Sequence, residues 1–516
     1  MIRKIRKANE VVIKPKEEFA YGYIIKALAG GLYPNKFHVI REYIQNAFDA
    51  VINWKNTHND QNVYIKITIK KPSISIFDNG TGMDRLTLNE YRKVGFSKKK
   101  IGETVGFRGI GKLAGISVAK KLIVTTTPYG IGEKYTLEFD AEAMLKEVDR
   151  LKQNQQNIPL NSLIEKYTNL TSSIEDKNAH YTFVQLYGIR RDSKILFDKN
   201  KLKDYIAKNA PAPFSPEFSY GKEIEEGIKK FVEDYECVNI LVDSEYIYKP
   251  FISNVNKPQH IVIWDDKEKN KILGYCWYCE NKDKGQIKPL HLAGLIYRYK
   301  NFAVGDHTLP RKTLWKNSPH LAFYFIGEIY ICDRNIIPTS QRDDFEQNAA
   351  RNKFYQEGSQ IASELNRIAR ASSGERRALH YIDIGRTVIS ETRSALKSQG
   401  FYLKDLSAEK VAQIYNVINN IEKRKENIPE KDRKNRTLAD RIIKEGKSLL
   451  KKFEGNKKLS EKYDITKKVH LNSQAKDVYS IAIRTLKDFF VDNHQGLERI
   501  IKLFHKNLID FFSKRK

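Results

Sequence analysis

The sequence predicts an α/β protein in three parts, in which two mixed α/β regions precede a helical C-terminal region. Short segments that alternate apolar and polar residues recur between residues 63 and 332, separated by stretches with apolar residues at helical spacing. Beyond about residue 350 the strand signals stop. A chain of 516 residues is too long for one hydrophobic core, so we expect domains over 1–192, 193–348 and 349–516.

Composition narrows the class of protein. No apolar run approaches the length of a membrane span, and the charged N-terminus lacks the apolar stretch of a signal peptide. Four cysteines in a chain of this length do not form a disulfide scaffold. We therefore expect a soluble, cytoplasmic protein that has no membrane partner.

The formal net charge is +28, and Lys and Arg outnumber Asp and Glu in the C-terminal region. Clustered cations neutralise the phosphates of nucleic acids, which makes a nucleic-acid partner of this region one interpretation. The other is a genome whose codons favour Lys, Asn, Ile and Tyr, since the sequence is rich in all four. Charge alone does not choose between them.

The sequence of the N-terminal region predicts an order of helices and strands. Residues 17–57 carry helical spacing, and VYIKITIK and SISIF then form a hairpin pattern. A glycine-rich stretch over 80–115 precedes the strand-like segments KLIVTTT and KYTLEF. Residues 141–178 are polar and indicate a mostly helical insertion, after which HYTFVQLYGI indicates a buried strand.

The first motif is REYIQNAFDA, which contains Glu42, Asn46 and Asp49. Offsets of four and seven residues place these three on one helix face, beside Val39 and Ala50. An acid, an amide and an acid that face a core are costly unless they serve a site. The alternative is a polar patch whose hydrogen bonds are all satisfied within the fold.

The second motif, FDNGTGM, directly follows a predicted strand and contains Asp78, Gly80, Gly82 and Met83. A carboxylate at a strand end followed by two glycines lets the backbone approach a flat ligand closely, and Asp78 can accept from an exocyclic amine. The alternative is an ordinary Asp-Asn-Gly turn.

The third motif is GFRGIGKLAG, with Gly106, Gly109 and Gly111. Glycines at this spacing let backbone N–H groups surround phosphate oxygens, next to the N-terminus of the helix expected from Gly111. The segment also nearly matches a Walker A loop. However, Leu113 stands where that loop needs Ser or Thr for Mg²⁺, and no clear strand leads into it.

Together and in this order, the three motifs resemble the N box, the adenine box and the glycine-rich lid box of the GHKL superfamily. That superfamily contains DNA gyrase, the heat-shock-protein-ninety chaperones, histidine kinases, MutL and MORC proteins. Thr182 in HYTFVQL resembles its fourth element. The resemblance covers about residues 20–190 well and extends weakly to about 345. It implies a Bergerat-type α/β sandwich over 1–192, a transducer-like middle domain, and the cofactors ATP and Mg²⁺.

The resemblance also implies roles for residues. Glu42 would be the general base, and Asn46 would coordinate Mg²⁺. Asp78 would bind the adenine amine, supported by Thr182 and Gly82. The other implied nucleotide-binding residues are Asp49, Gly80, Met83, Ser97, Lys98, Gly106, Arg108, Gly109, Gly111 and Lys112.

A second catalytic candidate lies far along the chain, in ICDRNIIPTSQRDDF. This segment resembles the middle-domain loop of the heat-shock-protein-ninety chaperones, in which an arginine reaches the γ-phosphate, and Arg342 is the matching residue. Its spacing departs by one residue from that pattern. The alternative is a surface arginine paired with Asp343 or Asp344.

The family habit suggests a homodimer gated by ATP, and three outputs stay open. The first is a clamp that acts on nucleic acid, or with a separate nuclease, in repair or phage defence. The second is a chaperone-like ATPase that remodels a protein client. The third is a regulatory module that senses nucleotide with little turnover.

Overall fold

The computed structural model describes residue 25 and residues 35–93, 111–156, 158–265, 271–315, 318–398 and 403–453. The chain divides into two compact units, Met1–Arg370 and Ala371–Lys516. We describe each unit by itself. The domain boundaries expected near residues 192 and 348 stay predictions.

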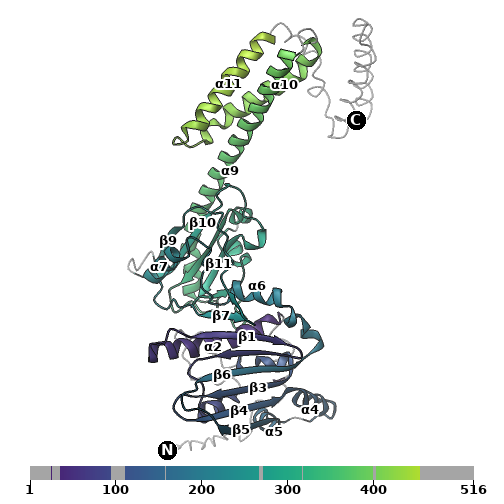
Figure 1. The fold of residues 1–516 in the computed structure, drawn as a ribbon, viewed down its shortest axis with the longest axis vertical. Coiled ribbons are helices and arrows are strands. Elements are labelled where there is room, and N and C mark those ends of the chain that lie inside the picture. Colours follow the sequence, from purple (N-terminus) through teal and green to yellow (C-terminus); the bar gives the residue numbers. More distant parts are fainter. Residues whose placement is uncertain are drawn as a thin grey trace, which may run out of the picture. The chain divides into compact units, whose positions relative to one another are not determined.

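The first unit contains an eight-stranded sheet in the order β5-β4-β3-β6-β2-β1-β7-β8 (Figure 1). Adjacent strands are antiparallel except β1 and β7, which are parallel. The strands are β1 (Tyr64–Lys70), β2 (Ser73–Asp78), β3 (Ala119–Thr127), β4 (Glu133–Asp140), β5 (Thr168–Ile174), β6 (Tyr181–Ile189), β7 (Asn239–Val242) and β8 (Glu245–Ile247).

One face of this sheet is covered by helices. Buried and half-buried residues alternate along β1, β4 and β6, as expected for strands with one face in a core. The covering helices share a single apolar core with the sheet. They include α2 (Phe37–His58), the 3₁₀ helix η1 (Gly111–Ser117), α4 (Ala141–Gln153), α5 (Leu160–Lys166) and α6 (Lys199–Asn209).

Residues 141–178 are helical only in part. Helices α4 and α5 agree with the expected insertion, but Thr168–Ile174 forms the edge strand β5, paired with β4. Most of its side chains are exposed on both faces, so the segment lacks the apolar alternation of a half-buried strand. The mostly helical insertion expected here therefore contains α4 and α5, and the strand β5 was not predicted.

A second sheet in the same unit has five strands in the order β12-β11-β13-β10-β9. Strands β10 and β13 are buried on both faces, because one apolar cluster packs on each side of the sheet. Helices α7 (Gly221–Phe231) and α8 (Thr308–Thr313) accompany this sheet. The strands are β9 (Gln259–Trp264), β10 (Ile272–Glu280), β11 (Gly294–Tyr299), β12 (Phe302–Val304) and β13 (Phe325–Ile331).

The described residues of the second unit form helices and the short connections between them. Helix α9 (Ala349–Ser398) continues into this unit, followed by α10 (Leu403–Arg424) and α11 (Arg433–Phe453). An apolar cluster that includes Ile382, Ile418 and Ile442 holds the helices together. The predicted α/β class with a helical C-terminal region is confirmed. In the part of the chain that the structure describes, no helix has the length and apolar composition that crossing a membrane requires.

Candidate functional site

Helix α2 carries a half-buried polar stripe. Between residues 37 and 51 its side chains are mostly buried, but Glu42, Asn46, Asp49 and Ala50 are only half-buried and follow one another at helical spacing. The structure thus places the acid, the amide and the acid on one face, next to the motifs described below. These side chains are therefore less buried than the core-facing residues around them on α2.

Three neighbouring strands end in a row of buried polar side chains. Asp78 on β2 is in register with Thr182 on β6, and Thr182 is in register with Thr126 on β3. The hydroxyls of Thr126 and Thr182 lie 3.1 Å apart, and Thr126 Oγ1 also accepts from the backbone N–H of Met83 at 2.9 Å. The row continues the buried faces of all three strands, so it lies at the edge of the core.

Asp78 is a buried carboxylate whose side chain is held in place by backbone donors. Its Oδ1 accepts from the N–H of Gly80 at 3.0 Å, and only 4% of the residue is exposed. Burial raises the pKa of Asp78 to about 7, while the N–H groups of Gly80 and Thr182 oppose that rise. Because a further hydrogen bond would stabilise the ionised form of this buried carboxylate, Asp78 can accept one from a donor on a ligand.

The turn after Asp78 depends on its glycines. Gly82 has a φ of +64°, and a Cβ at this position would lie 2.0 Å from the carbonyl oxygen of Thr127. A Cβ on Gly80 would lie 2.6 Å from the backbone of Ala50 on α2. The turn therefore packs against α2 so closely that only glycine fits at these two positions.

The lid motif meets the same helix. A Cβ on Gly111 would lie 2.2 Å from Oε2 of Glu42, so the Glu42 carboxylate rests directly against the start of η1. The Tyr43 hydroxyl accepts from the N–H of Gly115 at 2.8 Å and donates to the carbonyl of Lys112 at 3.2 Å. The Lys112 ammonium donates to the carbonyl of Glu90 at 3.0 Å. The remaining candidates for the phosphate side lie outside the described residues: Ser97, Lys98, Gly106, Arg108 and Gly109.

Arg342 comes from a tight turn that follows the second sheet. The turn is closed by a bridge between Pro338 and Phe345, and Arg342 adopts a left-handed φ of +56°. Its carbonyl accepts from the N–H of Gly305 at 2.7 Å. From α2, Nη2 of Arg41 donates to the carbonyl of Gln341 at 3.1 Å. The turn is thus attached both to its own sheet and to α2.

The side chain of Arg342 is buried next to the stripe on α2. Only 6% of the residue is exposed, so the surface arginine considered above is wrong. Burial, and then the neighbouring Arg41, lower the pKa of Arg342 to about 10, while Glu42, Tyr299 and Asp49 oppose that fall. The two catalytic candidates, which are 300 residues apart in sequence, therefore lie within electrostatic reach of each other.

Sequence reasoning missed three residues of this site: Arg41, Tyr43 and Thr126. Arg41 is 3% exposed and its Nη2 lies 3.4 Å from Oε1 of Glu42. A charged residue at a core-facing helix position, directly before Glu42, was a usable signal for it. The run of three threonines that ends β3 was a weaker signal for Thr126, and nothing in the sequence pattern pointed to the hydroxyl of Tyr43.

Comparisons with known proteins agree with this geometry. Residues 35–179 match the family described as histidine kinase-, DNA gyrase B-, and HSP90-like ATPase. The chain is 23% identical over 181 residues to the chaperone protein HtpG of Helicobacter pylori, a match that covers 31% of this chain and 27% of that protein. It is 29% identical over 150 residues to HtpG of Rickettsia typhi, covering 25% and 24%. The chain thus spans about a quarter of the length of the curated relatives it matches.

The burial of Asp78 predicts a pH-dependent stability. Because its pKa rises from 3.8 to about 7 on folding, the folded state holds a proton that the unfolded state has lost over this range. The free energy of unfolding should therefore fall as pH rises towards 7, by about 1.4 kcal/mol per pH unit relative to Asp78→Asn. Denaturant unfolding of both proteins across this window measures the difference. Parallel stability curves for the two proteins would contradict the assignment.

Proposed function

We propose that this chain binds ATP with Mg²⁺ and hydrolyses it between Glu42 and Arg342, because residues 35–179 match the family of histidine kinase-, DNA gyrase B-, and HSP90-like ATPases. The observation that carries the proposal is the burial of Arg342 beside the α2 stripe. An acid able to act as general base and a cation able to stabilise a phosphoryl group are the two parts that such a hydrolysis requires.

The adenine end of the site fits its proposed ligand. The buried carboxylate of Asp78 is the acceptor for the exocyclic amine, and its pKa of about 7 keeps it able to ionise at neutral pH. Gly82 follows Asp78 in a turn where a Cβ would collide with the backbone of Thr127, and this turn would let the backbone approach the base closely. The hydroxyls of Thr126 and Thr182 supply further polar contacts, directly or through water.

The phosphate end fits as well. Gly111 begins η1 directly against the Glu42 carboxylate, and backbone N–H groups at this start of η1 would bind phosphate oxygens. The amide oxygen of Asn46, one helical turn after Glu42, would hold Mg²⁺, which neutralises phosphate charge when it is bound. Burial lowers the pKa of Lys112 to about 8, and its ammonium would exchange the Glu90 carbonyl for a phosphate oxygen.

The reaction then rests on three side chains. Arg41 lies 3.4 Å from Glu42 and orients that carboxylate, which would take a proton from the attacking water. Arg342 would supply positive charge to the oxygens of the transferred phosphoryl group. Since both arginines are buried, little water screens these charges, which makes each interaction stronger than it would be at a surface.

Glu42→Gln tests the general base. This variant keeps the size and polarity of the side chain but cannot accept the proton, so ATP should still bind while steady-state hydrolysis falls at least about 100-fold. Glu138→Gln is the matched control and should keep the wild-type rate, since Glu138 is a half-buried glutamate on β4 that pairs with Lys121. If the wild-type protein does not bind ATP, the proposed nucleotide site is wrong. If Glu42→Gln hydrolyses ATP at the wild-type rate, Glu42 is not the general base.

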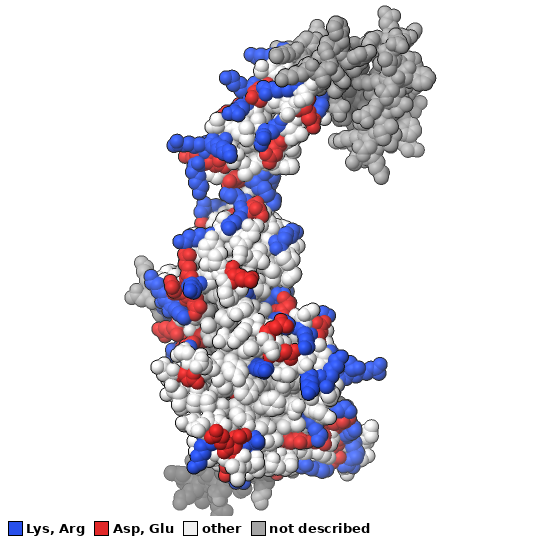
Figure 2. Space-filling model, viewed as in Figure 1, with Lys and Arg blue, Asp and Glu red and all other residues white. Residues whose placement is uncertain are grey.

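For the output, we propose an ATP-gated homodimer that acts on nucleic acid, either alone or with a separate nuclease. Figure 2 shows Lys and Arg side chains gathered over α9, α10 and α11, interspersed with Asp and Glu. A chaperone-like ATPase that acts on a protein client is the second candidate, supported by the similarity to HtpG and by the Arg342 turn. A nucleotide-sensing module with little turnover is the third.

The effect of duplex DNA on ATP hydrolysis distinguishes these three proposed functions. If the clamp is right, DNA should stimulate ATP hydrolysis, and its binding should weaken steeply with salt because counterions are released from the phosphates. The measurement is ATPase activity with and without duplex DNA, together with DNA affinity at several salt concentrations. Hydrolysis that is unaffected by DNA but stimulated by an unfolded protein would favour the chaperone, and negligible turnover under both conditions would favour the sensor.

A further inference from the structure

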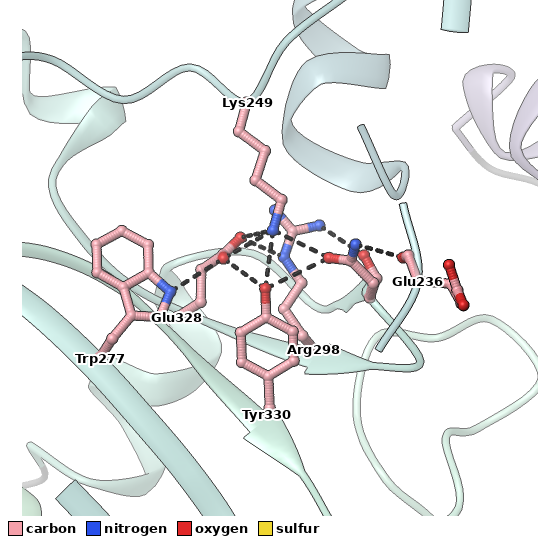
Figure 3. Close-up of polar contacts among 7 residues, drawn as sticks. Glu236, Lys249, Trp277, Arg298, Glu328 and Tyr330 are labelled. Atoms are coloured by element: carbon pink, nitrogen blue, oxygen red, sulfur yellow. Dashed lines mark hydrogen bonds and ion pairs between the residues drawn. The ribbon is translucent and has the colours of Figure 1, made fainter. Parts of the chain in front are cut away.

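The second sheet encloses a network of polar side chains that none of the sequence motifs includes (Figure 3). Its members come from β10, β11, β13, the β11–β12 turn and the segment after β8, and each is at most 1% exposed. We call the following set the buried network: Lys249, Trp277, Arg298, Asn301, Glu328 and Tyr330.

Glu328 lies at the centre of the network. It accepts from Lys249 Nζ at 2.8 and 3.0 Å, from Arg298 Nε at 2.6 Å, and from the Trp277 indole at 3.2 Å. The Tyr330 hydroxyl donates to it at 2.7 Å. Although burial alone would raise it, the pKa of Glu328 is lowered to about 2 by Arg298 and Lys249. The carboxylate is therefore ionised and fully bonded.

Burying these charged side chains costs desolvation free energy, which an apolar core would not require. Two buried cations face one buried carboxylate, and well-packed apolar side chains of similar volume often stabilise a fold as well or better. What polar groups add is direction, because each hydrogen bond fixes the position of a particular atom. A network of this kind can therefore fix a particular segment of the chain in place.

The network fixes the turn between β11 and β12. Asn301 adopts a left-handed φ of +62° in this turn. Its Oδ1 accepts from Lys249 at 2.9 Å, and its Nδ2 donates to the carbonyl of Glu236 at 2.8 Å. Arg298 Nη1 donates to the backbone carbonyl of Asn301 at 3.3 Å. Side chain and backbone of the turn are thus both held.

The residues that follow the turn form the support for Arg342. Phe302 packs edge-on against Phe48 of α2, with ring centroids 5.3 Å apart, and belongs to the core of the first sheet. The guanidinium of Arg342 lies 5.9 Å from the centre of the Phe302 ring. Three residues later, Gly305 donates to the Arg342 carbonyl.

A second connection reaches α2 directly. The side chain of Glu236, whose carbonyl accepts from Asn301, pairs with Lys55 near the end of α2 at 2.8 Å. The segment around Glu236 leads into β7, which pairs with β1 of the first sheet. The buried network therefore ties the second sheet to the helix that carries Glu42, from two sides.

We propose that the buried network is a positioning device for the phosphate-side arginine: by fixing Asn301 and so Phe302, it sets where Arg342 lies relative to Glu42. This inference rests on the proposed ATPase function. Asn301, Lys249 and Glu328 are positioning residues, since they act on the reaction through Arg342. They set the rate of hydrolysis and leave ATP binding at Asp78 unchanged.

Asn301→Gly tests the proposal in the full-length chain. Glycine keeps the left-handed turn but removes the side-chain bonds to Lys249 and Glu236. We expect ATP affinity within about twofold of wild type and a turnover rate lowered about tenfold, because small displacements of a charge-stabilising group cost rate. Asn281→Gly is the matched control, since it removes another buried asparagine of this region outside the network, and it should keep the wild-type rate.

A double variant distinguishes positioning from a general loss of structure. If Asn301 acts through Arg342, adding Asn301→Gly to Arg342→Ala should slow turnover no further. The proposal is overturned if Asn301→Gly and Asn281→Gly have equal rates, or if Asn301→Gly slows Arg342→Ala by the same factor as wild type. If wild-type protein and Glu42→Gln have the same negligible ATPase activity, the proposed function fails and the inference falls with it.

Discussion

The burial of two arginines against one glutamate is the constraint on which the rest of this structure depends. Burial, and then the neighbouring Arg41, lower the pKa of Arg342, and both arginines lose water on folding. Glu42 and Asp49 offset that cost by their negative charge. Helix α2 must therefore present its acidic stripe and Arg41 at the same time, and the turn at Arg342 must close onto it.

This constraint explains why both sheets of the first unit contribute residues to the candidate site. The first sheet supplies Asp78, Thr126 and Thr182 at its strand ends, while the second supplies a cation through a turn. The candidate site needs the residues of both sheets. In the proposed function, a change that moves the turn would therefore alter the charge around Glu42 and leave Asp78 unchanged, which would give ATP hydrolysis and ATP binding separate structural controls.

Local patterns predicted the parts of the site that local sequence determines. Offsets of four and seven along a helix gave the stripe of Glu42, Asn46 and Asp49, and the two glycines after Asp78 marked a turn in which Gly82 needs its positive φ. Local sequence patterns did not predict the elements whose structure depends on pairing with distant strands. The edge strand β5 is too polar to be recognised, and β7 joins the first sheet only through its parallel pairing with β1. The neighbours of Arg342 and the buried network depend on contacts across hundreds of residues, which no local spacing encodes.

The most direct test of the account is single-turnover ATP hydrolysis by Arg342→Ala and Arg342→Lys, measured beside the ATP affinity of each variant. The account predicts near wild-type affinity for both, hydrolysis at least about 100-fold slower for alanine, and partial recovery for lysine, which restores the charge but not the planar donor geometry. Hydrolysis by Arg342→Ala at the wild-type rate would show that the buried arginine takes no part in the reaction.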